Sequence, residues 1–264
     1  VLGLEGGSPL SRMRAYEAMG GTAYWQSDYE TMTHSYQRAL DLARELEDPL
    51  QEAKALYNAS FEPSLGGDTE RAIAQLEEAR DIYLAYPDSV GLSDVLSSLA
   101  VMRVGEGQYQ AALEAAQQAI EIARKSGNDL RLSWALFSAA YLASEADDPV
   151  GSEYLDESLV MFERDNDLSG IAFALGAIAL RSLATEDEPA AARMYGAALR
   201  HMEIADTSLF LSGEQDRTRL EALALLAETH PVAFAQGREM ATGEAIGAAR
   251  HQLGLPGDRP ADTD

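Results

Sequence analysis

Apolar residues recur along most of the chain at intervals of three, four and seven, which is the pattern of amphipathic α-helices. In the first half of the sequence the pattern is carried by Tyr36, Ala39 and Leu40, by Ala72, Leu76 and Ala79, and by Ala112, Ala116 and Ala119. Each group lies on one face of its helix. The pattern therefore predicts helices that pack against neighbouring helices through that face.

Short polar segments separate these helices at a constant spacing. Residues 26–29, 66–69, 106–109 and 146–149 are predicted to form the tight turn inside successive helix pairs, 40 residues apart. Second turns are predicted between the pairs at 46–49, 86–89, 126–129 and 165–167, which are rich in helix-ending residues. A fifth, weaker unit covers 168–201, with its turn near 186–189. A repeat of this length indicates a solenoid of stacked helix pairs.

The best copy of the repeat, residues 19–40, resembles the tetratricopeptide family. It has the small residue Gly20, the turn residue Tyr29, the aromatic Tyr36 and the small Ala39 at the family's spacing. The third copy matches through Leu99, Ala100, Tyr109, Ala112 and Ala119. Other copies depart from the pattern: Pro63 stands late in a first helix, and Pro149 replaces the turn aromatic.

The resemblance implies an all-α fold: a right-handed superhelical solenoid of about five tetratricopeptide-like helix pairs over residues 11–207, after an N-terminal flank at 1–10. The period exceeds the family's usual value of about 34 residues, so we expect lengthened helices or turns. From 208 to 253 the pattern changes to capping helices, with Ser212 and Thr242 as expected N-caps. Residues 254–264 are predicted to be a flexible tail.

A second resemblance involves residues 11–30, 191–199, 219–226 and 234–246. These segments are similar to the C-terminal repeat region of large actinobacterial signal-transduction ATPase regulators, whose effector domains are of the LuxR (helix-turn-helix), antibiotic-regulatory or cyclase type. The resemblance implies an ATPase upstream of the repeats. Because the chain begins at Val1, we expect it to be a portion of a longer protein.

Charge and composition narrow the possible partners. The chain has 20 basic and 44 acidic residues and a formal net charge of −24, which disfavours direct binding to nucleic acid or to anionic membranes. No apolar run approaches the roughly 18 residues that a membrane span needs. With no cysteine, the chain has neither a disulfide nor a thiolate nucleophile. We expect a cytoplasmic protein.

The sequence contains no motif that points to catalysis. It has no phosphate-binding loop, no His-Glu-x-x-His pair and no Gly-x-Ser-x-Gly elbow, so we expect no cofactor, no metal site and no enzymatic activity in this segment. The four histidines are far apart, and each is expected to face solvent or to cap a helix.

Candidate binding residues come from projecting the first repeat onto the others. The projection places aromatic and polar side chains on the first helices of the pairs, where they are expected to line a concave groove. The predicted groove residues are Tyr24, Trp25, Tyr57, Asn58, Phe61, Arg103, Trp134, Phe137, Ser138, Tyr141 and Phe173. Aromatic rings beside a few polar groups are typical of peptide or small-molecule recognition. The alternatives are that the rings fill gaps between helices and that arginines such as Arg103 and Arg131 form ordinary salt bridges instead of meeting an acidic partner.

These observations favour a binding module over an enzyme. The expected function is recognition of a peptide, protein or small-molecule effector, with binding relayed to the upstream domains of the same chain. The alternative is a self-assembly scaffold that joins copies of the protein into a homo-oligomer. An enzyme with an unrecognised site is a third reading, without a motif to support it.

Overall fold

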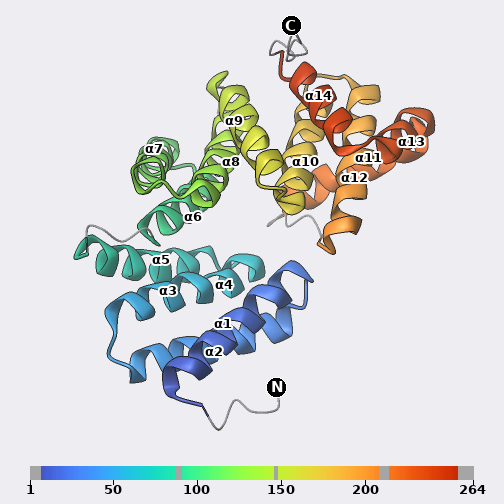
Figure 1. Cartoon of the computed structure of the whole chain (residues 1–264). Helices are drawn as coiled ribbons and strands as arrows, with labels where there is room; N and C mark the ends of the chain where they lie inside the picture. Colours follow the sequence, from blue (N-terminus) through green and yellow to red (C-terminus); the bar gives the residue numbers. More distant parts are fainter. Residues whose placement is uncertain (1–6, 87–90, 146–147, 208–213, 255–264) are drawn as a thin grey trace, which may run out of the picture. The chain divides into compact units, whose positions relative to one another are not determined.

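The computed structural model of the chain describes residues 7–86, 91–145, 148–207 and 214–254, and every regular element in these ranges is an α-helix (Figure 1). The helices fall into two compact units, unit 1 (Val1–Ala146) and unit 2 (Asp147–Asp264). The expected tail from residue 255 and the expected cap Ser212 lie outside the described residues. The prediction of an all-α helical-repeat fold is confirmed.

Unit 1 contains three helix pairs followed by a further first helix. Its helices are α1 (Pro9–Trp25), α2 (Tyr29–Glu45), α3 (Pro49–Ala59), α4 (Phe61–Gly66), α5 (Thr69–Leu84), α6 (Gly91–Gly105), α7 (Tyr109–Ser126) and α8 (Asp129–Glu145). Within the pairs α1 packs on α2, α3 on α5 and α6 on α7, while α8 packs on α6 and α7. We call α1, α3–α4, α6 and α8 the A helices, and α2, α5 and α7 the B helices.

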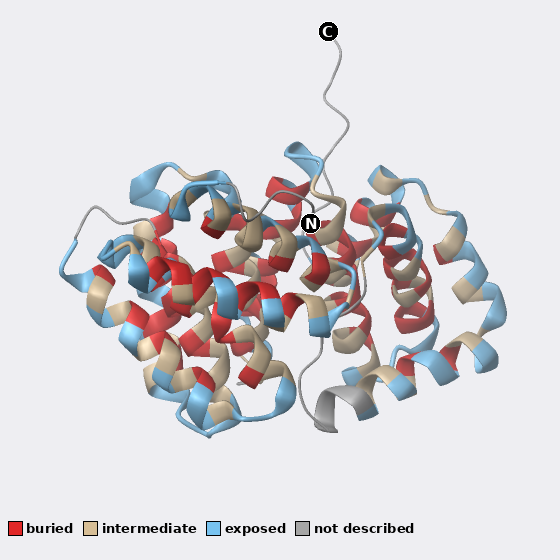
Figure 2. Cartoon of the chain, turned by 90° about the horizontal axis from the view of Figure 1, so that it is seen from below, coloured by how far each residue is buried: buried red, intermediate tan, exposed pale blue. Residues whose placement is uncertain are grey.

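Unit 2 contains one helix pair flanked by other helices. Its helices are α9 (Val150–Arg164), α10 (Leu168–Ala184), α11 (Glu188–Ala205), α12 (Glu214–Thr229), α13 (Pro231–Glu239) and α14 (Thr242–Gln252). The pair is α10 and α11; α9 packs on α10, and α13 packs on α11. Figure 2 shows the expected division of the helices into buried and exposed faces.

The turns have a common local chemistry. In most of them a residue with positive φ is followed by an aspartate that caps the next helix: Ser27–Asp28, Glu47–Asp48, Gly67–Asp68, Asn166–Asp167 and Glu186–Asp187. The aspartate accepts a hydrogen bond from a backbone N–H of the first helical turn, as at Asp28 Oδ1 from Thr31 N (3.1 Å). Most described turns lie where the sequence predicts, but the turn expected near 186–189 lies slightly earlier, because α10 ends at Ala184 and α11 begins at Glu188. Part of the acidic excess therefore serves to start helices.

Small residues let the paired helices approach closely. A Cβ atom at Gly20 of α1 would come within 2.5 Å of the Tyr36 ring of α2, so only glycine allows this contact. The residues at the same position of the next three A helices, Ser60, Ala100 and Ala140, are small and buried as well. The predicted role of Gly20 and Tyr36 in the packing of the first pair is thus confirmed.

Pro63 breaks the second A helix in two. A proline has no N–H to offer the carbonyl four residues earlier, and its ring collides with that carbonyl. Residue Ser60 ends α3, its hydroxyl donates to the Tyr57 carbonyl (2.7 Å), and α4 starts at Phe61. What the sequence pattern presents as one helix with a late proline is therefore two helices.

Two expectations for unit 2 are wrong. Thr242 is not the N-cap of α14: the cap is Ala241, whose N–H donates to the Glu244 carboxylate (3.0 Å). The Thr242 hydroxyl lies instead 3.1 Å from Nε2 of His201. His201 in turn neither faces solvent nor caps a helix, because it is buried in α11 with Nδ1 2.8 Å from the Ala197 carbonyl. The two residues form one polar contact between α11 and α14.

The close crossing of α11 and α13 depends on two glycines. A Cβ atom at Gly237 of α13 would overlap the backbone carbonyl of Arg193, and one at Gly196 of α11 would overlap the carbonyl of Phe234. Both glycines fall in segments on which the resemblance to the actinobacterial regulators rests. In this structure they serve helix packing.

Candidate functional site

Six of the predicted groove residues form one connected group of rings in unit 1. The rings come from A helices that are far apart in the sequence: α1, α3, α4 and α8. We call this group the aromatic cluster: Tyr24, Trp25, Tyr57, Phe61, Trp134 and Phe137.

Ring contacts link the members of the cluster from end to end. The Trp25 ring lies against Trp134, with centroids 5.8 Å apart, and against Tyr24, at 5.3 Å. Tyr24 contacts Phe61 at 4.9 Å. The cluster extends from Phe61 to Tyr57 (5.3 Å) and from Trp134 to Phe137 (5.8 Å). These distances and the tilted or edge-on geometries are those of favourable aromatic pairs.

Local structure explains how the rings reach one another. Trp25 is the last residue of α1, and Phe61 is the first residue of α4, immediately after the break that Pro63 imposes. Trp134 and Phe137 are one turn apart on α8. Tyr24 and Phe61 pack on a buried core of Ala23, Met32 and Tyr36. The cluster is therefore attached to the core of the first two helix pairs.

The cluster is neither part of the core nor fully exposed. Each predicted groove residue is half-buried, so the aromatic rings keep part of their surface in contact with solvent. By contrast, the buried apolar residues of the A helices, such as Leu56, Leu99 and Leu136, are at most 1% exposed. The cluster thus differs from the hydrophobic core beside it.

Tyrosine hydroxyls near the cluster remain protonated at physiological pH. Burial, and then the neighbouring Asp94 carboxylate, raise the pKa of Tyr57 above its ordinary value, although a hydrogen bond with Ser98 acts in the opposite direction. Burial also raises the pKa of Tyr24. Both hydroxyls can therefore act as neutral hydrogen-bonding groups.

Two ion pairs connect A helices in unit 1. Lys54 Nζ of α3 lies 2.8 Å from Glu17 Oε2 of α1, and Arg131 Nε of α8 donates to both carboxylate oxygens of Asp94 in α6, at 3.0 Å. Each pair spans 37 residues. Burial raises the pKa of Asp94, and Arg131 opposes the shift. We call Glu17–Lys54 and Asp94–Arg131 the acid–base ladder.

The acids of the ladder influence two tyrosines of the B helices, Tyr36 and Tyr83. Burial and the Glu17 carboxylate raise the pKa of Tyr36 to about 12, and Tyr36 contacts Phe61 at 6.3 Å. Burial is the main cause that raises the pKa of Tyr83 to about 12, and the carboxylates of Asp94 and Glu17 add to this shift. The predicted groove residues did not include Glu17. The spacing of 37 residues between Glu17 and Lys54, close to one repeat, was the sequence feature that could have indicated an ion pair between neighbouring A helices.

Three further groove residues, Asn58, Ser138 and Tyr141, lie on the same helices as members of the cluster. Asn58 follows Tyr57 on α3, and Ser138 and Tyr141 follow Phe137 on α8. Phe173 lies on α10 in unit 2.

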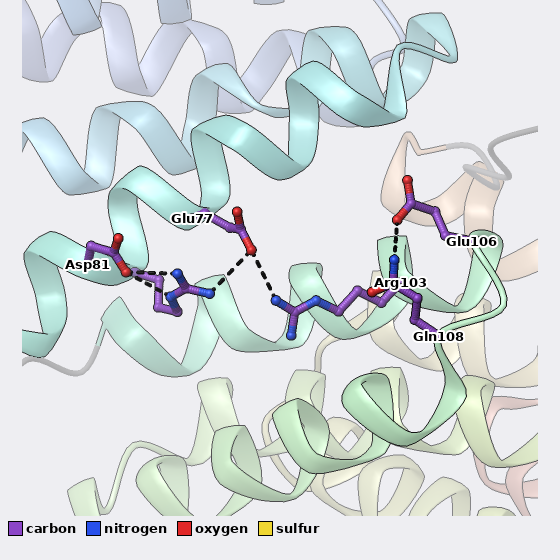
Figure 3. Close-up of polar contacts among 6 residues, drawn as sticks. Glu77, Asp81, Arg103, Glu106 and Gln108 are labelled. Atoms are coloured by element: carbon purple, nitrogen blue, oxygen red, sulfur yellow. Dashed lines mark hydrogen bonds and ion pairs between the residues drawn. The ribbon is translucent and has the colours of Figure 1, made fainter.

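Arg103 has a different environment from the one predicted. Its guanidinium Nη2 lies 3.1 Å from Glu77 Oε1 of α5, so it bridges an A helix and a B helix (Figure 3). Glu77 also accepts a contact from Arg80 (3.4 Å), which in turn pairs with Asp81 (2.8 Å). Arg103 is thus part of a surface ion-pair network, the alternative that the sequence left open.

The described residues contain neither a metal-binding group nor a membrane-spanning helix. In these ranges no three or more His, Asp or Glu side chains are grouped so that they could hold a metal ion. Among the described helices none has the length and hydropathy required to cross a membrane.

No family model matches the sequence. No curated protein matches it either. Solved structures do match. A Rap protein complexed with Competence and Sporulation Factor is similar with a TM-score of 0.68 and 15% identity, over 94% of this chain and 69% of that one.

Two further structures are similar over most of their length. The apo form of RapI has a TM-score of 0.56 and 14% identity, over 89% of this chain and 86% of its own. Aspartyl phosphate phosphatase F from Bacillus subtilis has a TM-score of 0.53 and 15% identity, over 90% and 70%. At these identities the likeness shows the fold alone, an all-α helical repeat of the tetratricopeptide-like type.

Proposed function

We propose that this chain is a non-catalytic binding domain that recognises a peptide or protein segment through the aromatic cluster of unit 1. The observation that carries the proposal is the gathering of six half-buried rings from three A helices, α1, α3–α4 and α8. Aromatic side chains offer a large contact area at a low cost in conformational entropy, and they dominate the energetics of many interfaces.

Neighbouring polar groups would give such a surface its specificity. The side chains of Asn58 and Ser138, which neighbour ring residues of the cluster on α3 and α8, can donate and accept hydrogen bonds. An extended peptide would use its backbone groups with these partners and its apolar side chains with the rings. The similar Rap protein complexed with Competence and Sporulation Factor is consistent with a ligand-binding role for this fold.

The wider context of the proposal is regulatory. In a longer protein of the actinobacterial regulator type, binding to this domain would be relayed to an upstream ATPase. Stacked helix pairs suit such a relay because a small rearrangement in each repeat adds up along the stack. This part of the proposal rests on the sequence resemblance alone.

Peptide selection on the intact chain tests the binding function. A library of randomised twelve-residue peptides is displayed and enriched on the wild-type chain, with a Trp25→Ala/Trp134→Ala variant as counter-target. We expect enriched peptides whose binding is lost in the variant and which change the intrinsic tryptophan fluorescence of the wild type. Enriched peptides that bind both chains equally, or no enrichment at all, would contradict the proposal. Light scattering over a range of concentrations separates this function from self-assembly.

A further inference from the structure

We propose that Glu17 receives a cationic group of the partner, so that the segment bound by unit 1 is a basic peptide. The inference rests on the proposed function and specifies its ligand. Lysine or arginine side chains would bind at Glu17, while the apolar residues of the same peptide contact the aromatic cluster.

Glu17 is an acceptor with unused capacity. Its side chain is only 9% exposed, and one carboxylate oxygen, Oε2, accepts from Lys54. The other oxygen, Oε1, is buried and has no hydrogen-bond partner among the described residues. A buried carboxylate oxygen without a donor destabilises the folded chain, because its hydrogen bonds to water are lost on burial and no protein hydrogen bond replaces them. A ligand that brings additional N–H donors would remove this cost.

Lys54 can be displaced from Glu17. Its side chain is 52% exposed and flexible, and its ammonium is a compact donor that water solvates readily. An exposed lysine of this kind is held weakly in an ion pair. In the unbound chain the Lys54 ammonium therefore occupies the position at Glu17 that the ligand's cationic group would take. Binding of the ligand replaces the Lys54 ammonium by that group.

The charges near the cluster select the sign of the ligand. Lys54 and Arg131 are each already paired with a carboxylate of the ladder, and Arg103 is paired with Glu77. An anionic peptide would have to separate one of these pairs and would also approach a chain with a net charge of −24. A cationic peptide is attracted by the same field. Arg103 and Arg131 thus form ordinary salt bridges, which the sequence offered as the alternative to an acidic partner.

The position of Glu17 fits a peptide that also contacts the rings. Glu17 precedes Tyr24 of the cluster by seven residues on α1, so the two side chains lie on the same face of that helix, about two turns apart. Its ion-pair partner Lys54 lies about one turn before Tyr57 on α3. Lysine and arginine have apolar stems that pack on aromatic surfaces and charged ends that interact favourably with ring faces. One basic segment can therefore use the cluster and Glu17 together.

The composition of the selected peptides provides the first test. We expect the peptides that depend on Trp25 and Trp134 to carry more Lys and Arg than the starting library. Dependent peptides that are neutral or acidic would overturn this inference and leave the proposed function intact. Peptides that do not depend on the two tryptophans would overturn both.

Matched variants distinguish Glu17 from the general charge of the chain. With a selected basic peptide as probe, Glu17→Gln is expected to weaken binding about tenfold or more, since it removes a partly buried charge partner. Glu121→Gln, which removes the same charge from an exposed pair on α7, should change binding less than about twofold. Equal effects of the two variants would overturn the assignment.

The two lysines of the chain give a second comparison that does not alter Glu17. Lys54→Gln removes the internal cation and is expected to tighten binding of the same peptide about threefold or more, whereas Lys125→Gln, with the same change in net charge, should alter it less than about twofold. Circular dichroism confirms that each variant is folded. Weaker or unchanged binding by a folded Lys54→Gln variant would overturn the exchange of cations.

Discussion

Trp25 at the end of α1 and Trp134 in α8 lie ring against ring, with 5.8 Å between their centroids, although helices α2 to α7 separate them in the sequence. They are also the two tryptophans of the chain. Intrinsic fluorescence therefore reports directly on the aromatic cluster, without a label.

The first prediction concerns this pair. Trp134→Ala removes the contacts with Trp25 and Phe137, and we expect it to lower the free energy of unfolding by about 1 to 2 kcal/mol. Urea denaturation followed by circular dichroism measures the change. Tyr109→Ala, at a 50% exposed ring on α7, is the control and should stay within about 0.5 kcal/mol of the wild type. Equal losses in both variants would argue against a cluster with its own contribution to stability.

Two adjacent glycines of α1 should respond in opposite ways to alanine. Gly20→Ala places a Cβ against the Tyr36 ring and is expected to cost about 1 to 3 kcal/mol. At Gly21 the nearest atom is the Tyr36 hydroxyl oxygen at 3.8 Å, so Gly21→Ala should gain up to about 1 kcal/mol from helix propensity. Thermal unfolding of the two variants provides the comparison, and a stabilised Gly20→Ala variant would show that the first pair is packed less closely than described.

The crossing of α11 and α13 gives an equivalent test in unit 2. Gly237→Ala would place a Cβ atom against the Arg193 carbonyl. Because a backbone carbonyl, unlike a side chain, cannot change rotamer to avoid the clash, we expect the free energy of unfolding to fall by about 3 kcal/mol or more. Gly247→Ala on α14 meets no atom within 4 Å and should gain about 0.5 to 1 kcal/mol. Denaturant unfolding measures both. A tolerated alanine at residue 237 would contradict the close approach.

The cap of α2 should depend on pH. Hydrogen bonds from the Thr31 side chain and backbone lower the pKa of Asp28 below its ordinary value of 3.8. An acid whose pKa is lowered by folding contributes stability above its unfolded pKa and loses that contribution as the pH falls through the folded value. Asp28→Ala is therefore expected to be less stable than the wild type at pH 7, with the difference shrinking below pH 3.8. A difference that stays constant down to acid pH would argue against a charged cap.

The turns and the first helix pair were predictable because their chemistry is local. Glycine followed by aspartate is a helix-ending and helix-starting signal in the sequence at Gly67–Asp68. At Ser27–Asp28 the aspartate cap is such a signal, but the positive φ of Ser27 is not, because serine has no special tendency for it. The contact between Gly20 and Tyr36 follows from a family spacing that the first repeat matches well.

Long-range relationships were less accessible. The contact of Trp25 with Trp134 depends on how successive pairs stack, and a small rotation at each pair decides it. The pairing of Arg103 with Glu77 depends on the register between α5 and α6, and the burial of His201 depends on where α14 packs. Periodicity assigns a side chain to one face of its own helix but does not identify the neighbour that it meets.

Most of the described turns are closed by their own residues: one left-handed position reverses the backbone, and one aspartate caps the next helix. A connection of this kind makes no demand on the side chains in the middle of the helices that it joins. The middle of each A helix can therefore change its residues while the spacing of the repeat stays constant. Positions such as Gly20 remain fixed by packing on the neighbouring helix, but other positions between the turns are free of that demand. Under the proposed function, a new ligand preference would arise by substitution at those positions without any change in the connections.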